Sequence, residues 1–70
     1  MNAFRKYVAR PLAEKCFRER RPTLYTEEPL PADYEALRSA IRRACGRREP
    51  SASEEEIFEE EWRDVYRSCQ

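Results

Sequence analysis

The residues of this 70-residue chain that could do chemistry are carboxylates, cysteines and arginines. Histidine is missing from the sequence and glycine occurs once, at Gly46. The common catalytic triads, imidazole metal sites, phosphate-binding glycine loops and dinucleotide fingerprints are therefore excluded. Glutamates cluster in residues 54–61, EEEIFEEE, but on a small exposed helix they would be hydrated rather than tuned for acid–base catalysis. We expect no enzyme, no catalytic residue, no cofactor and no metal site.

Cysteine occurs at three widely spaced positions, Cys16, Cys45 and Cys69. The odd number and the spacing give no CxxC zinc knuckle and no evident disulfide framework. We expect three thiols in a reducing intracellular compartment, with one disulfide among them as the open alternative.

Charge is unevenly distributed along the chain, although the formal net charge is zero. Residues 1–21 hold seven basic and two acidic side chains, net +5, and residues 51–70 hold two basic and seven acidic ones, net −5. Either the two ends fold together and neutralise each other, or each faces a partner of opposite charge. The basic residues expected to contact acidic protein, anionic lipid or RNA are Arg5, Lys6, Arg10, Arg18, Arg20 and Arg21.

The first two segments that position these groups are a helix and a strap. Residues 1–21 form a predicted basic helical segment with an apolar residue at every fourth position: Phe4, Val8, Leu12 and Cys16. Pro11 removes a backbone hydrogen bond, so we expect a bend there. Prolines at both ends of residues 22–31 predict an extended strap over 22–30. Its Leu24, Tyr25 and Leu30 pack either on the chain's own helices or in the groove of a neighbour.

A central helix is predicted over residues 31–46. Proline at its start, Arg42 and Arg43 in its last turn, and Gly46 after it are typical start and stop signals. One narrow apolar face is formed by Tyr34, Leu37, Ile41 and Ala44. Small residues beside it, such as Ala40, would let another helix approach closely.

An acidic amphipathic helix is predicted over residues 51–70. Ser51 or Ser53 can cap it, with Glu54 or Glu56 three positions further on. Its broad apolar face comprises Ile57, Phe58, Trp62, Val65, Tyr66 and Cys69. This face is the strongest amphipathic pattern in the chain.

The sequence thus predicts one small all-α chain of two to three amphipathic helices joined by a proline-rich strap. Charged residues make up 40% of so short a chain, so we expect a partner to complete its core. The residues predicted to bind that partner are Ile57, Phe58, Trp62, Val65, Tyr66, Tyr34, Leu37 and Ile41.

These patterns favour a non-enzymatic accessory subunit that docks into a larger protein assembly. Residues 1–13 contain no acid, which is typical of mitochondrial presequences and interfacial helices, so we expect a mitochondrial respiratory, ATP synthase or ribosomal complex. The sequence contains no run long and apolar enough for a membrane span, so any membrane contact is expected to be peripheral. The alternatives are a freestanding helical regulator that binds and inhibits one protein, and an RNA-contacting component of a ribonucleoprotein.

Overall fold

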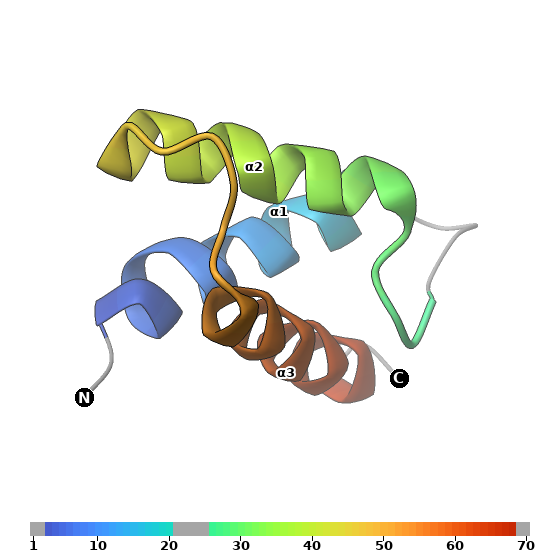
Figure 1. Cartoon of the computed structure of the whole chain (residues 1–70). Helices are drawn as coiled ribbons and strands as arrows, with labels where there is room; N and C mark the ends of the chain where they lie inside the picture. The colour runs from blue at the N-terminus through green and yellow to red at the C-terminus, as the bar shows by residue number, and fades with distance from the viewer. Residues whose placement is uncertain (1–2, 21–25, 69–70) are drawn as a thin grey trace.

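The computed structural model describes residues 3–20 and 26–68, and within these ranges every regular element is a helix. A π-helical segment, η1 (Arg5–Ala9), runs directly into α1 (Arg10–Arg20), and two longer helices follow, α2 (Pro31–Cys45) and α3 (Ala52–Ser68). In Figure 1, α2 runs along the top and α3 lies below it, with the N-terminal helical segment between them in this view. The all-α fold class predicted from the sequence is confirmed. In the described ranges no helix combines the length and the apolar character needed to cross a membrane.

The irregular turn in the N-terminal helix lies immediately before Pro11. The backbone N–H of Arg10 donates to the carbonyl of Arg5, five residues earlier, which is the π-helical pattern. Proline has no N–H to donate, and its ring crowds the carbonyl four residues before it. A widened turn ahead of Pro11 relieves both problems, so the irregularity falls where the sequence predicts a bend.

Local capping fixes the ends of α2 and α3. Before α2, the Asp33 carboxylate accepts the backbone N–H of Leu30 at 2.7 Å, and after it Gly46 adopts the left-handed conformation at φ 72°. At the start of α3, the Ser51 hydroxyl accepts the N–H of Glu54 at 3.2 Å, and the Glu54 carboxylate accepts the N–H of Ser51 at 2.7 Å. Of the two caps that the sequence allows, the structure has the one at Ser51.

The core lies around Trp62, where the three helices meet. The Trp62 ring is 4.6 Å from Phe17 of α1 and 5.8 Å from Phe58, measured between ring centroids. Ala9 and Ala13 are fully buried, and their small side chains let the N-terminal segment approach α3 closely. The buried apolar residues are Ala9, Ala13, Cys16, Phe17, Leu37, Ile41, Phe58, Trp62 and Val65.

The described part of the strap, residues 26–30, packs on α3 of the same chain. The indole N–H of Trp62 donates to the carbonyl of Thr26 at 2.8 Å, and Arg63 donates to the Glu28 carboxylate at 2.8 Å. Pro29 is buried. Leu24 and Tyr25, for which the sequence allows packing either on the chain's own helices or on a neighbour, lie outside the described residues.

Candidate functional site

The apolar face predicted to anchor in a partner is the protein's own core. Of the eight predicted residues, those that are buried are Leu37, Ile41, Phe58, Trp62 and Val65, and those that are partly buried and packed against the core are Tyr34, Ile57 and Tyr66. In the chain by itself these residues pack against one another, and their predicted contact with a partner stays a prediction. The stripes of α2 and α3 face inward against Ala9, Ala13, Cys16 and Phe17 of the N-terminal segment, because burying them there removes apolar surface from water. The stripe predicted for that segment is only partly inside the core, since Phe4, Val8 and Leu12 are partly buried.

Tyr34 joins α2 to α3 at the edge of this core. Its ring packs edge-on against Phe58 with 6.0 Å between centroids, and its hydroxyl donates to the Glu59 carboxylate at 2.6 Å. Burial, and then this carboxylate, raise the pKa of the Tyr34 hydroxyl above its ordinary value. The phenol is thereby kept protonated as a hydrogen-bond donor, which is a structural role.

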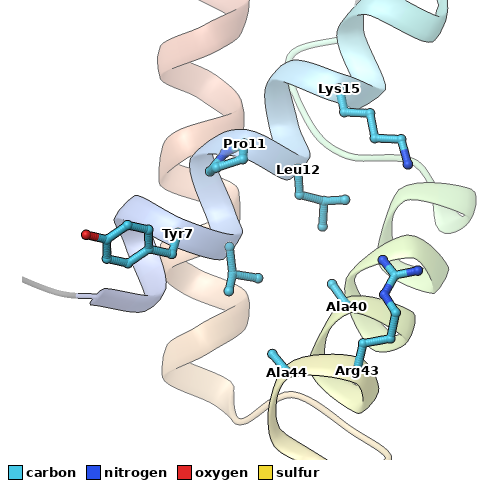
Figure 2. Close-up of a pocket in the computed structure, with 8 residues that line it drawn as sticks. Tyr7, Pro11, Leu12, Lys15, Ala40, Arg43 and Ala44 are labelled. Carbon is cyan, nitrogen blue, oxygen red and sulfur yellow. The ribbon is translucent and has the colours of Figure 1, made fainter.

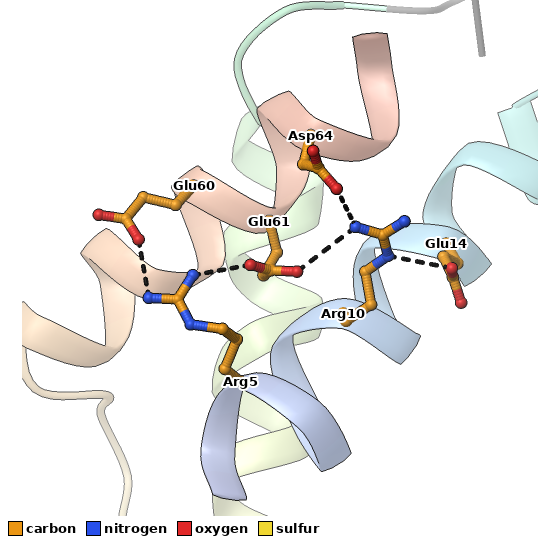
Figure 3. A network of polar contacts seen from close by, with 6 residues as sticks. All are labelled: Arg5, Arg10, Glu14, Glu60, Glu61 and Asp64. Carbon is orange, nitrogen blue, oxygen red and sulfur yellow. Dashed lines mark hydrogen bonds and ion pairs between the residues drawn. The ribbon is translucent and has the colours of Figure 1, made fainter. Parts of the chain in front are cut away.

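The basic N-terminal segment and the acidic α3 neutralise each other across the fold. Arg5 contacts Glu60 at 2.8 Å and Glu61 at 2.7 Å, while Arg10 contacts Glu61 at 3.5 Å and also Asp64 (Figure 3). The hydrogen bonds that Arg5 donates to Glu61 and Glu60 raise the pKa of Arg5, and the hydrogen bond that Arg10 donates to Asp64 is the largest cause that raises the pKa of Arg10. Of the two arrangements that the sequence allows, the structure has the ends folded together.

Glu61 departs from the expectation that the glutamates of residues 54–61 are all hydrated. Its side chain is 14% exposed, and it is bridged by the guanidinium groups of Arg5 and Arg10. This carboxylate is therefore committed to holding two helical segments together. In residues 3–20 and 26–68 no group of three or more cysteine, aspartate and glutamate side chains is placed to hold a metal ion.

The other residues of the predicted basic contact segment are placed differently from Arg5 and Arg10. Lys6 and Arg18 are exposed, and neither forms an ion pair with the described part of the chain. The Lys6 ammonium lies 5.3 Å from the centroid of the Tyr7 ring. The side chain of Arg20 and the whole of Arg21 lie outside what the structure describes. Of the four predicted basic residues whose side chains the structure describes, Lys6 and Arg18 are thus available on the surface.

A shallow groove lies between the N-terminal helical segment and α2. Eight residues line it, and we refer to the apolar Val8, Leu12, Ala40 and Ala44 as its floor and to Tyr7, Pro11, Lys15 and Arg43 as its rim. Leu12 projects toward α2, and Lys15 and Arg43 extend toward one another at one end (Figure 2). The alanines of α2 are too small to fill the space opposite Val8 and Leu12. We call this hollow the α1–α2 groove.

The α1–α2 groove combines an apolar floor with a positive rim. Neither Lys15 nor Arg43 forms an ion pair with the described part of the chain, in contrast to Arg5 and Arg10. Tyr7 at the edge is 69% exposed and is the one large apolar side chain with high exposure among the described residues. The hollow has a volume of about 360 Å³ and is open to solvent. Such a surface suits a ligand that is partly apolar and partly anionic.

The residues on both sides of this groove can be recognised in the sequence, but the sequence does not show that they lie next to each other. Val8 and Leu12 belong to the apolar stripe of residues 1–21, and Ala40 is one of the small residues expected to allow close helix approach. The sequence predicts Ala44 on the apolar face of the central helix, but the structure exposes it to solvent. A signal in the sequence is the run of small residues Ala36, Ala40 and Ala44 at four-residue spacing, which leaves one side of α2 without bulk.

The cysteines lie in different environments. Cys16 is buried in the core, whereas Cys45 is exposed at the end of α2, and no disulfide joins these two. Cys69 lies outside the described residues.

Comparison with known proteins adds no relative to this picture. No protein-family model matches the chain, and searches of curated proteins and of solved structures find no significant match.

Proposed function

We propose that this chain is a non-enzymatic helical docking subunit, which binds a partner protein through the α1–α2 groove. The observation that carries the proposal is an apolar hollow between two helices whose opposite faces are already buried in the core. Val8 and Leu12 remain only partly buried there, so a partner that covers them gains the free energy of removing apolar surface from water. The exposed Tyr7 beside them is a residue type that is often dominant in interfaces.

The dimensions of the groove favour a protein segment over a small molecule. A volume of about 360 Å³ is near the lower end of small-molecule sites, which also enclose most of the ligand surface and converge several polar groups on it. The α1–α2 groove is open along its surface and has two cations at one end. Helices commonly bind in such grooves by inserting apolar side chains from successive turns.

The proposal keeps the role of an accessory subunit in a larger assembly, with a mitochondrial respiratory, ATP synthase or ribosomal complex as the expected setting. The acid-free residues 1–13 support a mitochondrial location on composition. Lys6 and Arg18, exposed beside the groove-forming helix, are available for a second contact within such an assembly.

A second candidate function is a freestanding regulator that binds and blocks one protein. It is favoured by the burial of Trp62, which has no exposed surface although the chain is alone. Fractionation of the native source separates the two functions. A subunit migrates with a large particle at every step, whereas a regulator is found mainly as free chain and joins its target in proportion to concentration.

The docking groove is tested by filling it. Ala44→Trp places a bulky side chain over the floor from an exposed position, and Ser39→Trp places the same side chain on α2 away from the groove. We expect tagged Ala44→Trp to lose co-purification with the partner from the native source, and Ser39→Trp to retain it. Equal retention of both variants, with unchanged circular dichroism, would show that the groove is not the docking surface.

A further inference from the structure

We infer that the partner segment bound in the α1–α2 groove is an acidic amphipathic helix; this inference rests on the docking function proposed above. The groove has an apolar floor and a pair of cations at its rim, so its occupant needs both apolar side chains and negative charge. An amphipathic helix with glutamate or aspartate beside its apolar stripe supplies both.

The charge of the occupant follows from Lys15 and Arg43. Their side chains extend toward one another across the end of the groove, and no acidic side chain of the described residues pairs with either (Figure 2). Two like charges that converge without an anion repel each other, and a carboxylate placed between them reverses the sign of the interaction. Because both cations are exposed, this contact selects the partner more than it adds affinity.

The surroundings of the groove strengthen the positive field. Lys6 lies beside Tyr7 at one edge, and Arg18 follows Lys15 by three residues on α1. Both are exposed and without an ion pair in the described part of the chain. Glu19 is the acidic residue one turn beyond Lys15, and it lies outside the groove lining. The rim therefore remains positive overall.

The helical form of the occupant follows from the shape of the groove. Ala40 and Ala44 are one turn apart on α2, and small residues at this spacing let a neighbouring helix approach to about 8–10 Å between axes. Val8 and Leu12 have the same spacing on the opposite wall. Apolar side chains at positions i, i+4 and i+7 of a bound helix would lie between the two walls. The described residues contain no strand whose edge could pair with an extended partner.

A second copy of this chain does not fit the groove. A symmetric contact through the groove would place Lys15 and Arg43 of one copy against the same cations of the other. The acidic helix that the chain does possess, α3, is already committed, because its apolar face forms the core and its Glu61 is bound to Arg5 and Arg10. The occupant is therefore a different protein.

The test uses three synthetic helical peptides of about four turns with one common apolar stripe and with glutamate, glutamine or lysine at the flanking positions. Each is titrated into the isotopically labelled full chain, and amide chemical shifts give the site and the affinity. We expect the shifts to map to Val8, Leu12, Ala40 and Ala44. The glutamate peptide should bind about tenfold more tightly than the glutamine peptide at low salt, as two or three exposed ion pairs would produce. This preference should shrink at high salt.

Charge reversal supplies the matched control. In Lys15→Glu/Arg43→Glu the preference should reverse toward the lysine peptide. In Arg48→Glu/Arg67→Glu, which changes the net charge equally at exposed positions outside the groove, the preference for glutamate should persist. The shifts of Lys15 and Arg43 also give the affinity for phosphatidylserine vesicles and for single-stranded RNA. If either binds more tightly than the glutamate peptide, the inference is overturned in favour of lipid or RNA.

The remaining outcomes separate this inference from the docking function. If Ala44→Trp releases the native partner but the three peptides bind equally, or none of them binds, docking stands and the acidic helix is wrong. If Ala44→Trp releases nothing, docking through the groove is itself wrong.

Discussion

Replacing Phe58 by alanine distinguishes an apolar face that forms the chain's own core from one that waits for a partner. Phe58 has no exposed surface and packs against Trp62 and Tyr34. Truncation of a buried phenylalanine to alanine costs about 3–5 kcal/mol, the sum of lost transfer free energy and the cavity left behind. At 0.05–0.15 kcal/mol per residue, the free energy of unfolding of a domain this size is about 4–10 kcal/mol. The variant is therefore expected to lose from about a third to all of its stability.

Urea titration of the purified chain measures this loss, with Trp62 fluorescence and far-UV circular dichroism as the two signals. Because a chain this short has an m-value of about 1 kcal/mol/M, the urea midpoint should fall by about 3–5 M, or the variant should be unfolded without urea. Phe58→Leu, which keeps most of the volume, should cost less than about 1.5 kcal/mol and remain folded.

Tyr7→Ala is the matched control, because it removes an aromatic ring that is 69% exposed. Its effect on the free energy of unfolding should stay within about 0.5 kcal/mol, while its binding to a partner should weaken. The reasoning is refuted if Phe58→Ala and Tyr7→Ala have the same midpoint. It is also refuted if the unmodified chain shows no cooperative transition, because the helices would then not form a core without a partner.

Two further predictions concern polar contacts between helices. Glu61→Gln removes the carboxylate that bridges Arg5 and Arg10, so the urea midpoint should fall by an amount equivalent to about 1 kcal/mol at low salt and by less at high salt. Glu56→Gln, at an exposed position without an ion pair in the described chain, should have almost no effect, and equal effects of the two would contradict the bridging role. Tyr34→Phe removes the hydrogen bond to Glu59. Because the folded state raises the pKa of Tyr34, its contribution to stability is fully present below pH of about 10 and is lost as the pH rises toward the folded-state pKa. The stability difference between the unmodified chain and Tyr34→Phe should therefore shrink above pH of about 10, and a difference that is constant with pH would count against this account.

Helix positions could be predicted from the sequence because their signals are local. Pro31 at the start of α2, Gly46 after it and the Ser51–Glu54 pair at the start of α3 act within one or two turns of backbone. Pro11 likewise disturbs only the turn before it. The observed bounds of α2 and α3 are within two residues of those predicted, because no distant part of the chain is needed to set them.

The directions in which the helices face were decided by the tertiary structure alone. The stripe of Phe58, Trp62 and Val65 has the same periodicity whether it meets a partner or the helices of its own chain, so the pattern cannot distinguish the two. Whether the basic and acidic ends meet, as Arg5 and Glu61 do, likewise depends on how the N-terminal segment crosses α3.

The α1–α2 groove likewise combines residues whose apolar character is evident from the sequence with an arrangement that only the tertiary structure sets. Val8 and Leu12 on one helix and Ala40 and Ala44 on another are ordinary residues of two amphipathic patterns, and a hollow exists only where the packing sets large side chains opposite small ones. By itself the sequence determined which segments are helical, where each begins and ends, and which residues of each are apolar, since these depend on neighbours within a few positions. The inward burial of those residues, the neutralisation of the two ends and the groove depend on contacts between segments far apart in the chain, which only the folded arrangement supplies.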